Sequence, residues 1–415
     1  MKRIWIRLSC AVLVLLLLAA AACEQVPPAE IESDSCESCE SEQVETESES
    51  DIDSATGGES QTDPDEETSD TDEGTDTTEP DQSESSSLPD QVDPDAPVVT
   101  AGEVGYTYPE LQEDLEALAH VYGEHFSYES IGQSVDGREI YACVVGNPEA
   151  PKKIMITGGI HGREYLSSLV VMMQIEHYLS DYQEGSFDGM TYAQMFEQYA
   201  FYVLPMINPD GIMLALCGIE SVQTPSVKET LEEIFADNTR DGLTSAEDIN
   251  DYFAYNWKAN ARGVDLNRNF ALSNWSEVMT GILSPCFRNY KGPRPASEPE
   301  TQAVSAYVES LGEIEGMLAF HTAGQVVYWD CGMTGAVRQE TSDLARAVCD
   351  HTGYRFIYDD HLDASLNDWM TLELGIPTVT VELANVIYPM PTSELDAAWE
   401  QARDLWVVTA QFFSQ

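Results

Sequence analysis

The stretch "ITGGIHGREYLSS", residues 156–168, joins the end of an apolar run to the start of a long helical pattern. The run "KKIMITGG" (residues 152–159) is typical of a buried strand, and "LSSLVVMMQIEHYLSDY" (residues 166–182) predicts a largely buried helix. A strand that passes through two glycines into a helix is a building unit of α/β proteins. His161 and Glu164 lie in the turn between the two, which makes this turn a candidate metal site.

Strand and helix patterns alternate along the rest of the chain from about residue 106. Further strands are expected in "EIYACVVG", "QYAFYVLPMINPDG", "EGMLAFHTAGQVVYW" and "PTVTVELAN", and helices in "YPELQEDLEALAHVYG" and "LDAAWEQARDLWVVTAQFF". Ser297 and Glu300 fit a capping box at the start of one more helix. We therefore predict a single α/β domain with a mixed, mostly parallel sheet flanked by helices. The polar residues 212–255 have the composition of an insertion.

The first 23 residues predict an export signal, because three basic residues precede an apolar run that is too short for a membrane span. Cys23 follows four alanines and resembles the lipidated cysteine of bacterial lipoproteins. We expect a lipoprotein on the extracellular face of a bacterial membrane, held there by Cys23. A conventional secretory signal, which would release the protein, is the alternative.

Residues 24–100 form an acidic segment with few apolar residues. Of the 74 acidic residues in the chain, 27 fall between residues 24 and 97, where there is no lysine or arginine. Such a composition predicts a disordered linker. The expected organisation is a signal segment over residues 1–23, a linker over 24–100 and one catalytic domain over 101–415.

The net charge limits the partners that the protein can bind, and the cysteine count limits its disulfide pairing. The net charge of −55 excludes binding to nucleic acid through bulk charge, because phosphates would repel the chain. An odd number of cysteines in an exported domain leaves at least one free thiol, and the sequence does not say which. The five cysteines of the globular part are Cys143, Cys217, Cys286, Cys331 and Cys349.

Four polar residues lie at or just after the ends of expected strands: His161, Asn208, His321 and Glu382. Active-site residues of open α/β sheets gather at strand ends. A His-x-x-Glu pair alone is weak evidence, since a surface turn with a local ion pair gives the same spacing. Four polar groups at strand ends favour a functional site.

Seven motifs occur in an order that resembles the carboxypeptidase A-like zinc peptidases, over residues 106–415. They are "GGIHGREY", "NPDG", "WKANARGVDLNRNF", "SEPET", "AFHTAGQVVYW", "LNDW" and "TVELAN". The resemblance implies one zinc ion per chain, bound by His161, Glu164 and His321. Catalytic zinc commonly has three protein ligands and one open position. The resemblance further implies that Glu382 is the general base.

Asn267 and Arg268 match the pair that holds the C-terminal carboxylate of the substrate in that family. An arginine suits this role because its planar fork binds a carboxylate with two hydrogen bonds. The implied substrate is a peptide with a free C-terminal carboxylate. Asn367 matches the residue at the base of the side-chain pocket, and Asp368 follows it.

The sequence departs from the family at two catalytic positions. Lys258 stands where the family has an oxyanion-stabilising arginine, and Arg262 is near enough in sequence to substitute for it. Tyr358 is the best match for the tyrosine that closes over the substrate, although it lies two residues further from Asp368 than expected. His361 is the alternative candidate for this position.

Substrate preference is left open by these motifs. Asn367 favours neither apolar, basic nor acidic C-terminal side chains, and a polar pocket suits a polar or zwitterionic one. Bacterial relatives include peptidases that cleave the γ-D-glutamyl–diaminopimelate bond of cell-wall stem peptides, which makes a cell-wall endopeptidase the alternative function. A catalytically inactive surface binding module is a third hypothesis, although all the expected ligands and the base are present.

Overall fold

The computed structural model describes residues 97–415, apart from residues 101, 330–331, 359–360 and 386. The expected signal segment with Cys23 and the linker up to residue 96 lie outside the described residues. Within the described part of the chain, no helix has the length and apolar character needed to cross a membrane.

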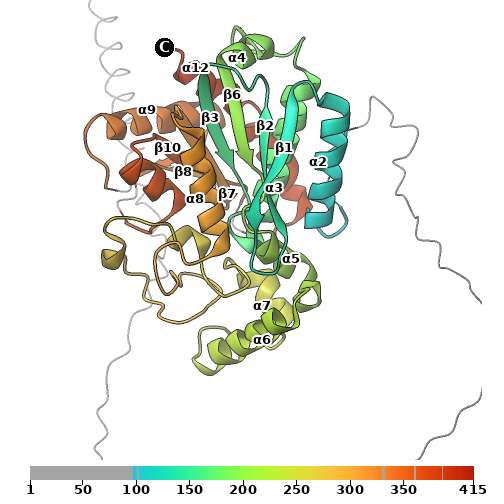
Figure 1. Cartoon of the computed structure of the whole chain (residues 1–415), viewed down its shortest axis with the longest axis vertical. Helices are drawn as coiled ribbons and strands as arrows, with labels where there is room; N and C mark the ends of the chain where they lie inside the picture. The colour runs from blue at the N-terminus through green and yellow to red at the C-terminus, as the bar shows by residue number, and fades with distance from the viewer. Residues whose placement is uncertain (1–96, 101, 330–331, 359–360, 386) are drawn as a thin grey trace, which may run out of the picture. The chain divides into compact units, whose positions relative to one another are not determined.

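One mixed sheet of eight strands forms the centre of the described residues, in the spatial order β1-β2-β6-β3-β7-β10-β8-β9 (Figure 1). The four strands β6, β3, β7 and β10 run parallel to one another, whereas β2 and β8 run antiparallel to their neighbours β6 and β10. This confirms the expected α/β domain with a mixed, mostly parallel sheet. The strands are β1 (Phe126–Gln133), β2 (Glu139–Val145), β3 (Lys152–Thr157), β6 (Tyr199–Leu204), β7 (Gly316–Thr322), β8 (Val326–Tyr328), β9 (Arg355–Ile357) and β10 (Thr378–Leu383).

Helices cover both faces of the sheet. In Figure 1, α8 crosses in front of the strands. The face of the sheet opposite α8 carries the larger apolar cluster. Helices on that face are α2 (Tyr108–Tyr122), α3 (Tyr165–Ser180), α4 (Tyr192–Gln198), α9 (Gly335–Thr352), α11 (Leu395–Ala402) and α12 (Leu405–Phe412), and those on the α8 face are α8 (Pro299–Leu311) and α10 (Leu366–Asp368).

The inner parts of β3 and β7 are apolar because both of their faces are buried. On β3, Ile154 and Ile156 pack into the cluster under α3, whereas Met155 packs into the cluster under α8. This alternation follows from the two-residue period of a strand. The apolar residues 154–156 of β3 are therefore consecutive in sequence although they pack into two separate cores.

Residues 212–255, expected as an insertion, form the end of α5 (Pro209–Cys217), α6 (Pro225–Arg240) and α7 (Ile249–Asn256). These helices lie at the lower end of the domain in Figure 1. They share a small apolar cluster in which Leu231, Phe253 and Trp257 are fully buried. Because Trp257 directly precedes Lys258, this cluster anchors the segment that carries the lysine.

Some local expectations were wrong. Helix α8 begins one residue later than expected, with Glu298 as its N-cap and no side-chain capping bond, so Ser297 and Glu300 form no capping box. Ser297 instead donates to the Glu298 carboxylate over 2.7 Å. The C-terminal helix is two helices, α11 and α12, which are separated at residues 403–404.

The four cysteines that the structure describes are all free thiols: Cys143, Cys217, Cys286 and Cys349. This agrees with the expectation of at least one free thiol in the domain. Cys331 lies outside the described residues.

A buried polar network lies beneath the insertion. Glu300 is fully buried, and its two carboxyl oxygens accept from the Val135 backbone N–H and from Asn260 Nδ2, each over 3.1 Å. Burial, with repulsion from Asp210, raises the pKa of the Glu300 carboxyl to about 8. Glu300 therefore keeps its proton at neutral pH in the folded chain.

Replacing Glu300 with glutamine should flatten the dependence of folding stability on pH. Between the ordinary pKa of 4.5 and the folded value of about 8, the unfolded chain loses this proton while the folded chain keeps it. Stability therefore falls as pH rises through this window, on the order of 1 kcal/mol per pH unit. Urea unfolding at pH 5 to 8 should show the Glu300→Gln curve diverging upward from that of the parent. If the unfolding free energies of the two proteins changed with pH in parallel, Glu300 would not have the raised pKa assigned to it. A loss of stability that is the same at every pH, caused by the new amide beside Asn260, would not affect this comparison.

Candidate active site

The turn after β3 places His161 and Glu164 on one side of a sharp bend. Gly159 has a φ of +62°, and a Cβ there would lie 2.2 Å from Ser168 Oγ. A Cβ on Gly162 would lie 2.3 Å from the Gly211 carbonyl oxygen. Only glycine fits these two positions, so the backbone can bend closely enough for both polar side chains to face the same point.

His321 and Glu382 reach this point from two neighbouring parallel strands. They are paired in register on β7 and β10. Side chains paired in register on adjacent strands point to the same face of the sheet. The histidine and the glutamate are therefore neighbours although 61 positions separate them in the sequence.

The three expected metal ligands, His161, Glu164 and His321, form one buried cluster, called the metal group below. His161 Nδ1 lies 3.0 Å from Glu164 Oε1, and His321 Nδ1 lies 3.1 Å from Glu164 Oε2. Ligand atoms that surround a tetrahedral zinc ion at its usual bond lengths are about 3.3 Å apart. Both His161 ring nitrogens and Glu164 Oε1 are buried without a hydrogen bond of good geometry. The donor atoms present fit a zinc ion in spacing, type and unsatisfied polarity.

Two further charged groups contact this metal group. Lys258 Nζ lies 2.9 Å from Glu164 Oε1, and Asp265 Oδ1 lies 3.3 Å from His161 Nε2. Burial alone would raise the pKa of the Glu164 carboxyl, but His161 and Lys258 hold this pKa well below its usual value. Glu164 is thus ionised, as a metal ligand must be. Asp265 stands where a carboxylate can orient a metal-binding imidazole.

Glu382 lies beside the metal group and has a carboxyl with a raised pKa. The side chain is partly exposed to the cavity, but its Oε2 atom is buried and has no hydrogen-bond partner in the described chain. Burial, with repulsion from the Glu164 carboxylate, raises the pKa of the Glu382 carboxyl to about 7. A carboxyl with a pKa near neutrality can both take up and return a proton.

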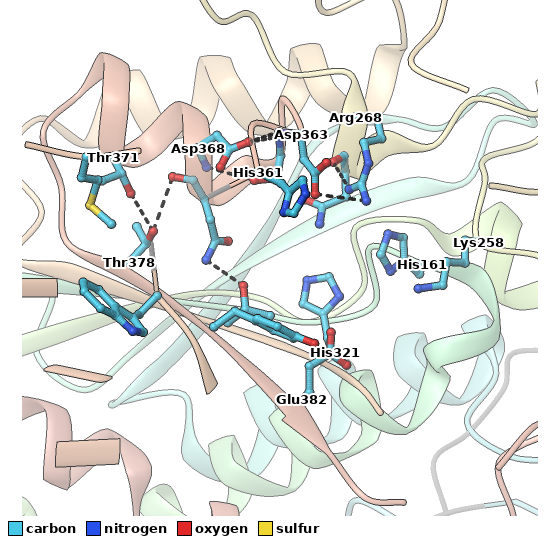
Figure 2. Close-up of a pocket in the computed structure, with 17 residues that line it drawn as sticks. His161, Lys258, Arg268, His321, His361, Asp363, Asp368, Thr371, Thr378 and Glu382 are labelled. Atoms are coloured by element: carbon cyan, nitrogen blue, oxygen red, sulfur yellow. Dashed lines mark hydrogen bonds and ion pairs between the residues drawn. The ribbon is translucent and has the colours of Figure 1, made fainter. Parts of the chain in front are cut away.

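One cavity of about 250 Å³ is lined by the two histidines of the metal group, by Lys258 and by Glu382. Figure 2 shows His161, His321 and Lys258 at one end of the cavity, with Thr371 and Thr378 at the other. Arg268 and Asp363 lie along the upper wall in this view. The cavity therefore connects the metal group with a cation on one wall and with hydroxyl groups at its far end.

Arg268 and Asn267 line the same cavity, as the sequence predicts. Arg268 Nη2 lies 3.2 Å from Asp363 Oδ2, and its Nη1 donates to the Asn267 carbonyl oxygen over 2.9 Å. The Asn267 side-chain oxygen accepts from the Leu366 backbone N–H over 3.1 Å, so the amide nitrogen is the end that can donate to a substrate. A carboxylate that enters here would share Arg268 with Asp363.

The end of the cavity far from the metal group is polar. Asn367 Nδ2 donates to Thr380 Oγ1 over 3.0 Å, and the Thr371 and Thr378 hydroxyls lie 2.8 Å apart. Asp368 also lines the cavity, but its carboxylate accepts from backbone N–H groups of residues 363 and 365 and so holds this loop in place.

The expected closing residue and the alternative oxyanion donor have different surroundings. Tyr358 is half exposed and packs edge-on against Trp329, with ring centroids 5.7 Å apart, but it is not among the cavity-lining residues. His361 does line the cavity (Figure 2). Arg262 lies 3.5 Å from Glu298 and does not line the cavity, which leaves Lys258 as the cation beside the metal group.

Three residues of the site were missed by the sequence reasoning. Asp265 lies within the quoted motif "DLNRNF", so its place two residues before Asn267 was the available signal. Arg163 stacks on the Tyr388 ring, 3.9 Å from its centroid, and the Tyr388 hydroxyl donates to the Thr322 carbonyl over 2.6 Å. No sequence spacing links Arg163 to Tyr388, because tertiary folding alone brings them together.

Comparison with known proteins gives one family. A family model described as zinc carboxypeptidase matches residues 111–405. The gamma-D-glutamyl-L-diamino acid endopeptidase 1 of Lysinibacillus sphaericus is 27% identical over 308 residues, which cover 74% of this chain and 72% of that protein. Carboxypeptidase B of Astacus astacus is 29% identical over 241 residues, which cover 58% of this chain and 68% of that protein.

The fold is also found in solved structures. Bovine thrombin-activatable fibrinolysis inhibitor superposes with a TM-score of 0.56 at 19% identity, covering 76% of this chain and 99% of that one. The matched fold agrees with the observed sheet, and the family model spans the metal group and Glu382. The chain accordingly belongs to the zinc carboxypeptidase family and is a zinc metallopeptidase.

Proposed function

We propose that this enzyme hydrolyses the peptide bond next to a free C-terminal carboxylate, with His161, Glu164 and His321 as the zinc ligands. The observation that carries the proposal is a single cavity that joins the metal group, the carboxyl of Glu382 and the guanidinium of Arg268. Trimming of chain ends requires a cation at a fixed place beyond the scissile bond, and Arg268 supplies it.

Zinc in such a site polarises the scissile carbonyl and lowers the pKa of a coordinated water. Glu382 then acts as the general base that accepts the proton of the attacking water and delivers it to the leaving nitrogen. Asn267 and Arg268 hold the terminal carboxylate and so fix the scissile bond relative to Glu382.

Lys258 supplies positive charge where the carbonyl oxygen gains negative charge. Lys258 lines the cavity and its side chain is 23% exposed, so a substrate can reach it. In this structure the ammonium contacts Glu164 Oε1 at 2.9 Å, beside the expected zinc position. The lysine ammonium is a compact charge, whereas an arginine guanidinium is a planar group with two parallel N–H donors. Lysine therefore restricts the position of the oxyanion less than an arginine would.

A matched pair of peptides tests this function. One peptide ends in a free carboxylate, and the other has the same sequence with a C-terminal amide. We expect release of the last residue from the acid to be on the order of 10- to 100-fold faster in kcat/KM, because only the acid can form the charged hydrogen bonds to Arg268. Equal rates, or cleavage within the peptide, would contradict the proposal.

A cell-wall endopeptidase is the second candidate, favoured by the polar end of the cavity. The Asn367–Thr380 and Thr371–Thr378 pairs offer hydroxyl and amide groups rather than an apolar or singly charged surface. Such a surface can bind the amino and carboxylate groups of a diamino acid side chain. The Lysinibacillus relative is named for cleavage at a diamino acid.

Mass spectrometry of digested muropeptides separates the two candidates. Cleavage between D-glutamate and the diamino acid, with no release of residues from ordinary peptides, would establish the wall-specific activity. Loss of single C-terminal residues from ordinary peptides, with intact muropeptides, would exclude it.

We also propose that the enzyme is exported and anchored to the outer face of the membrane through a lipid on Cys23. The support is the sequence of residues 1–23 alone. More than one acyl chain gives stable attachment. Cys23→Ser should move the protein from the membrane fraction to the soluble one and abolish incorporation of labelled fatty acid. Membrane recovery that is unchanged by this substitution would contradict the lipid anchor.

A further inference from the structure

Asn208 lies where three segments of the chain meet. These segments are the turn that carries His161 and Glu164, the beginning of α5, and the segment at residues 257–260 that carries Lys258. Asn208 is the N-cap of α5 and is fully buried, with 0% exposure. It does not line the cavity and cannot touch a substrate there.

The two ends of the Asn208 side chain have separate partners. Its oxygen accepts from the Gly211 backbone N–H over 2.9 Å, which caps α5. Its amide nitrogen donates to the carbonyl oxygens of Ile160 and Ala259 over 3.1 and 3.0 Å, and lies 3.4 Å from that of Lys258. The nitrogen therefore connects the residue before His161 with the backbone at Lys258.

Backbone hydrogen bonds run alongside this connection. The Gly162 N–H donates to the Lys258 carbonyl over 3.3 Å, and the Arg163 N–H donates to the Trp257 carbonyl over 2.8 Å. The Asn208 N–H itself donates to the Gly159 carbonyl over 2.9 Å. Without the Asn208 amide, the Ile160 and Ala259 carbonyls would each lose a buried hydrogen-bond donor, which disfavours this arrangement of the segments.

The space around Asn208 admits only small neighbours. A Cβ on Gly211 would lie 2.4 Å from Asn208 Nδ2 and 2.7 Å from the Ala259 carbonyl oxygen. The hydrogen bonds of Asn208 to the three segments, called the Asn208 clamp below, are therefore closely packed. A shift of one segment must displace the others.

We propose that Asn208 is a positioning residue that sets the place of the zinc-binding turn relative to Lys258. The contact between Lys258 Nζ and Glu164 Oε1 at 2.9 Å spans the two segments that Asn208 joins. The role of Lys258 rests on the function proposed above. The effect of Asn208 on zinc binding does not depend on substrate chemistry, and it can be measured separately.

Two substitutions separate the Asn208 clamp from the helix cap. Serine and aspartate both cap helices well, so Asn208→Ser and Asn208→Asp keep an acceptor for the α5 N–H groups. Both remove the amide donor, and the aspartate also directs a second oxygen toward the carbonyls of Ile160 and Ala259. Asn238→Ser is the matched control. Asn238, on α6, is likewise buried. It donates through Nδ2 to the Pro285 carbonyl in the loop that follows α7, and it accepts from the Tyr252 hydroxyl on α7.

The test measures the zinc dissociation constant by competition with a chromogenic chelator, kcat and KM at saturating zinc, and the melting temperature of the full chain. We expect Asn208→Ser to weaken zinc binding about 10- to 100-fold, as losses of residues that orient metal ligands do. At saturating zinc, kcat should fall while KM stays near the parent value, and Asn208→Asp should show the larger effects. Asn238→Ser should lower the melting temperature only.

The positioning role would be overturned if both Asn208 variants had the same zinc affinity and kcat as Asn238→Ser, because only stability would then have changed. Unmodified protein that binds zinc but hydrolyses no peptide would reject the proposed function, while the zinc constants would still decide the positioning role.

Discussion

Glu382→Gln should bind zinc as tightly as the parent and hydrolyse peptides about 10²- to 10⁴-fold more slowly, the usual contribution of general acid–base catalysis. Glutamine has the size of glutamate but cannot accept the proton of the attacking water. The loss should therefore appear in kcat, with little change in KM. Steady-state kinetics and metal analysis of the same preparation measure both quantities.

The stability of this variant gives a second, independent readout. The Oε2 atom of Glu382 is buried without a hydrogen-bond partner in the described chain, and such a carboxylate costs folding free energy. The melting temperature of Glu382→Gln should consequently equal or exceed that of the parent. Glu313→Gln, on an exposed loop, is the control and should change neither rate nor stability. A Glu382→Gln enzyme with the parental rate would exclude Glu382 as the base.

His321→Ala should lose zinc and, with it, hydrolysis. Only His161 and Glu164 would remain as ligands, and two protein ligands do not make a stable catalytic zinc site. In the parent chain, bound zinc should raise the free energy of unfolding by about 4 kcal/mol when its concentration is a thousand times the dissociation constant. Calorimetric scans with and without zinc measure this stabilisation, which the variant should lack.

His120→Ala is the matched control for the loss of a histidine, because His120 is exposed on α2, far in sequence from the metal group. This control should keep both zinc and rate. Stoichiometric zinc on His321→Ala, with parental stabilisation, would show that the three-ligand assignment is wrong.

The strands and helices near the site were predictable from sequence because they are buried. Strands β3 and β7 contain continuous apolar stretches, β10 alternates between threonine and valine, and α3 is buried on nearly all sides, so hydrophobic pattern and β-branched residues identify them. In the eight-stranded sheet, the strands that were missed lie at its two edges. β1 exposes most of its side chains, and β9 has only three residues, so neither gives a clear pattern.

Site residues could be predicted where a strand end or a motif marks them. His161, His321 and Glu382 satisfy both conditions, and the structure brings them together as expected. The closing role of Tyr358 stays a prediction, because its ring packs against Trp329 and it is not among the cavity-lining residues. Contacts such as Asp265 with His161 depend on how distant segments pack, and this information is absent from any local pattern.

Zinc titration of the metal-free enzyme tests the central claim most directly. Zinc is removed with a chelator, returned in measured fractions, and assayed in each sample together with release of the C-terminal residue from a free-acid peptide. We expect activity to rise in proportion to bound zinc and to reach its maximum at one ion per chain. Full activity in the zinc-free enzyme, or one bound zinc without any hydrolysis of free-acid peptides or muropeptides, would contradict the claim.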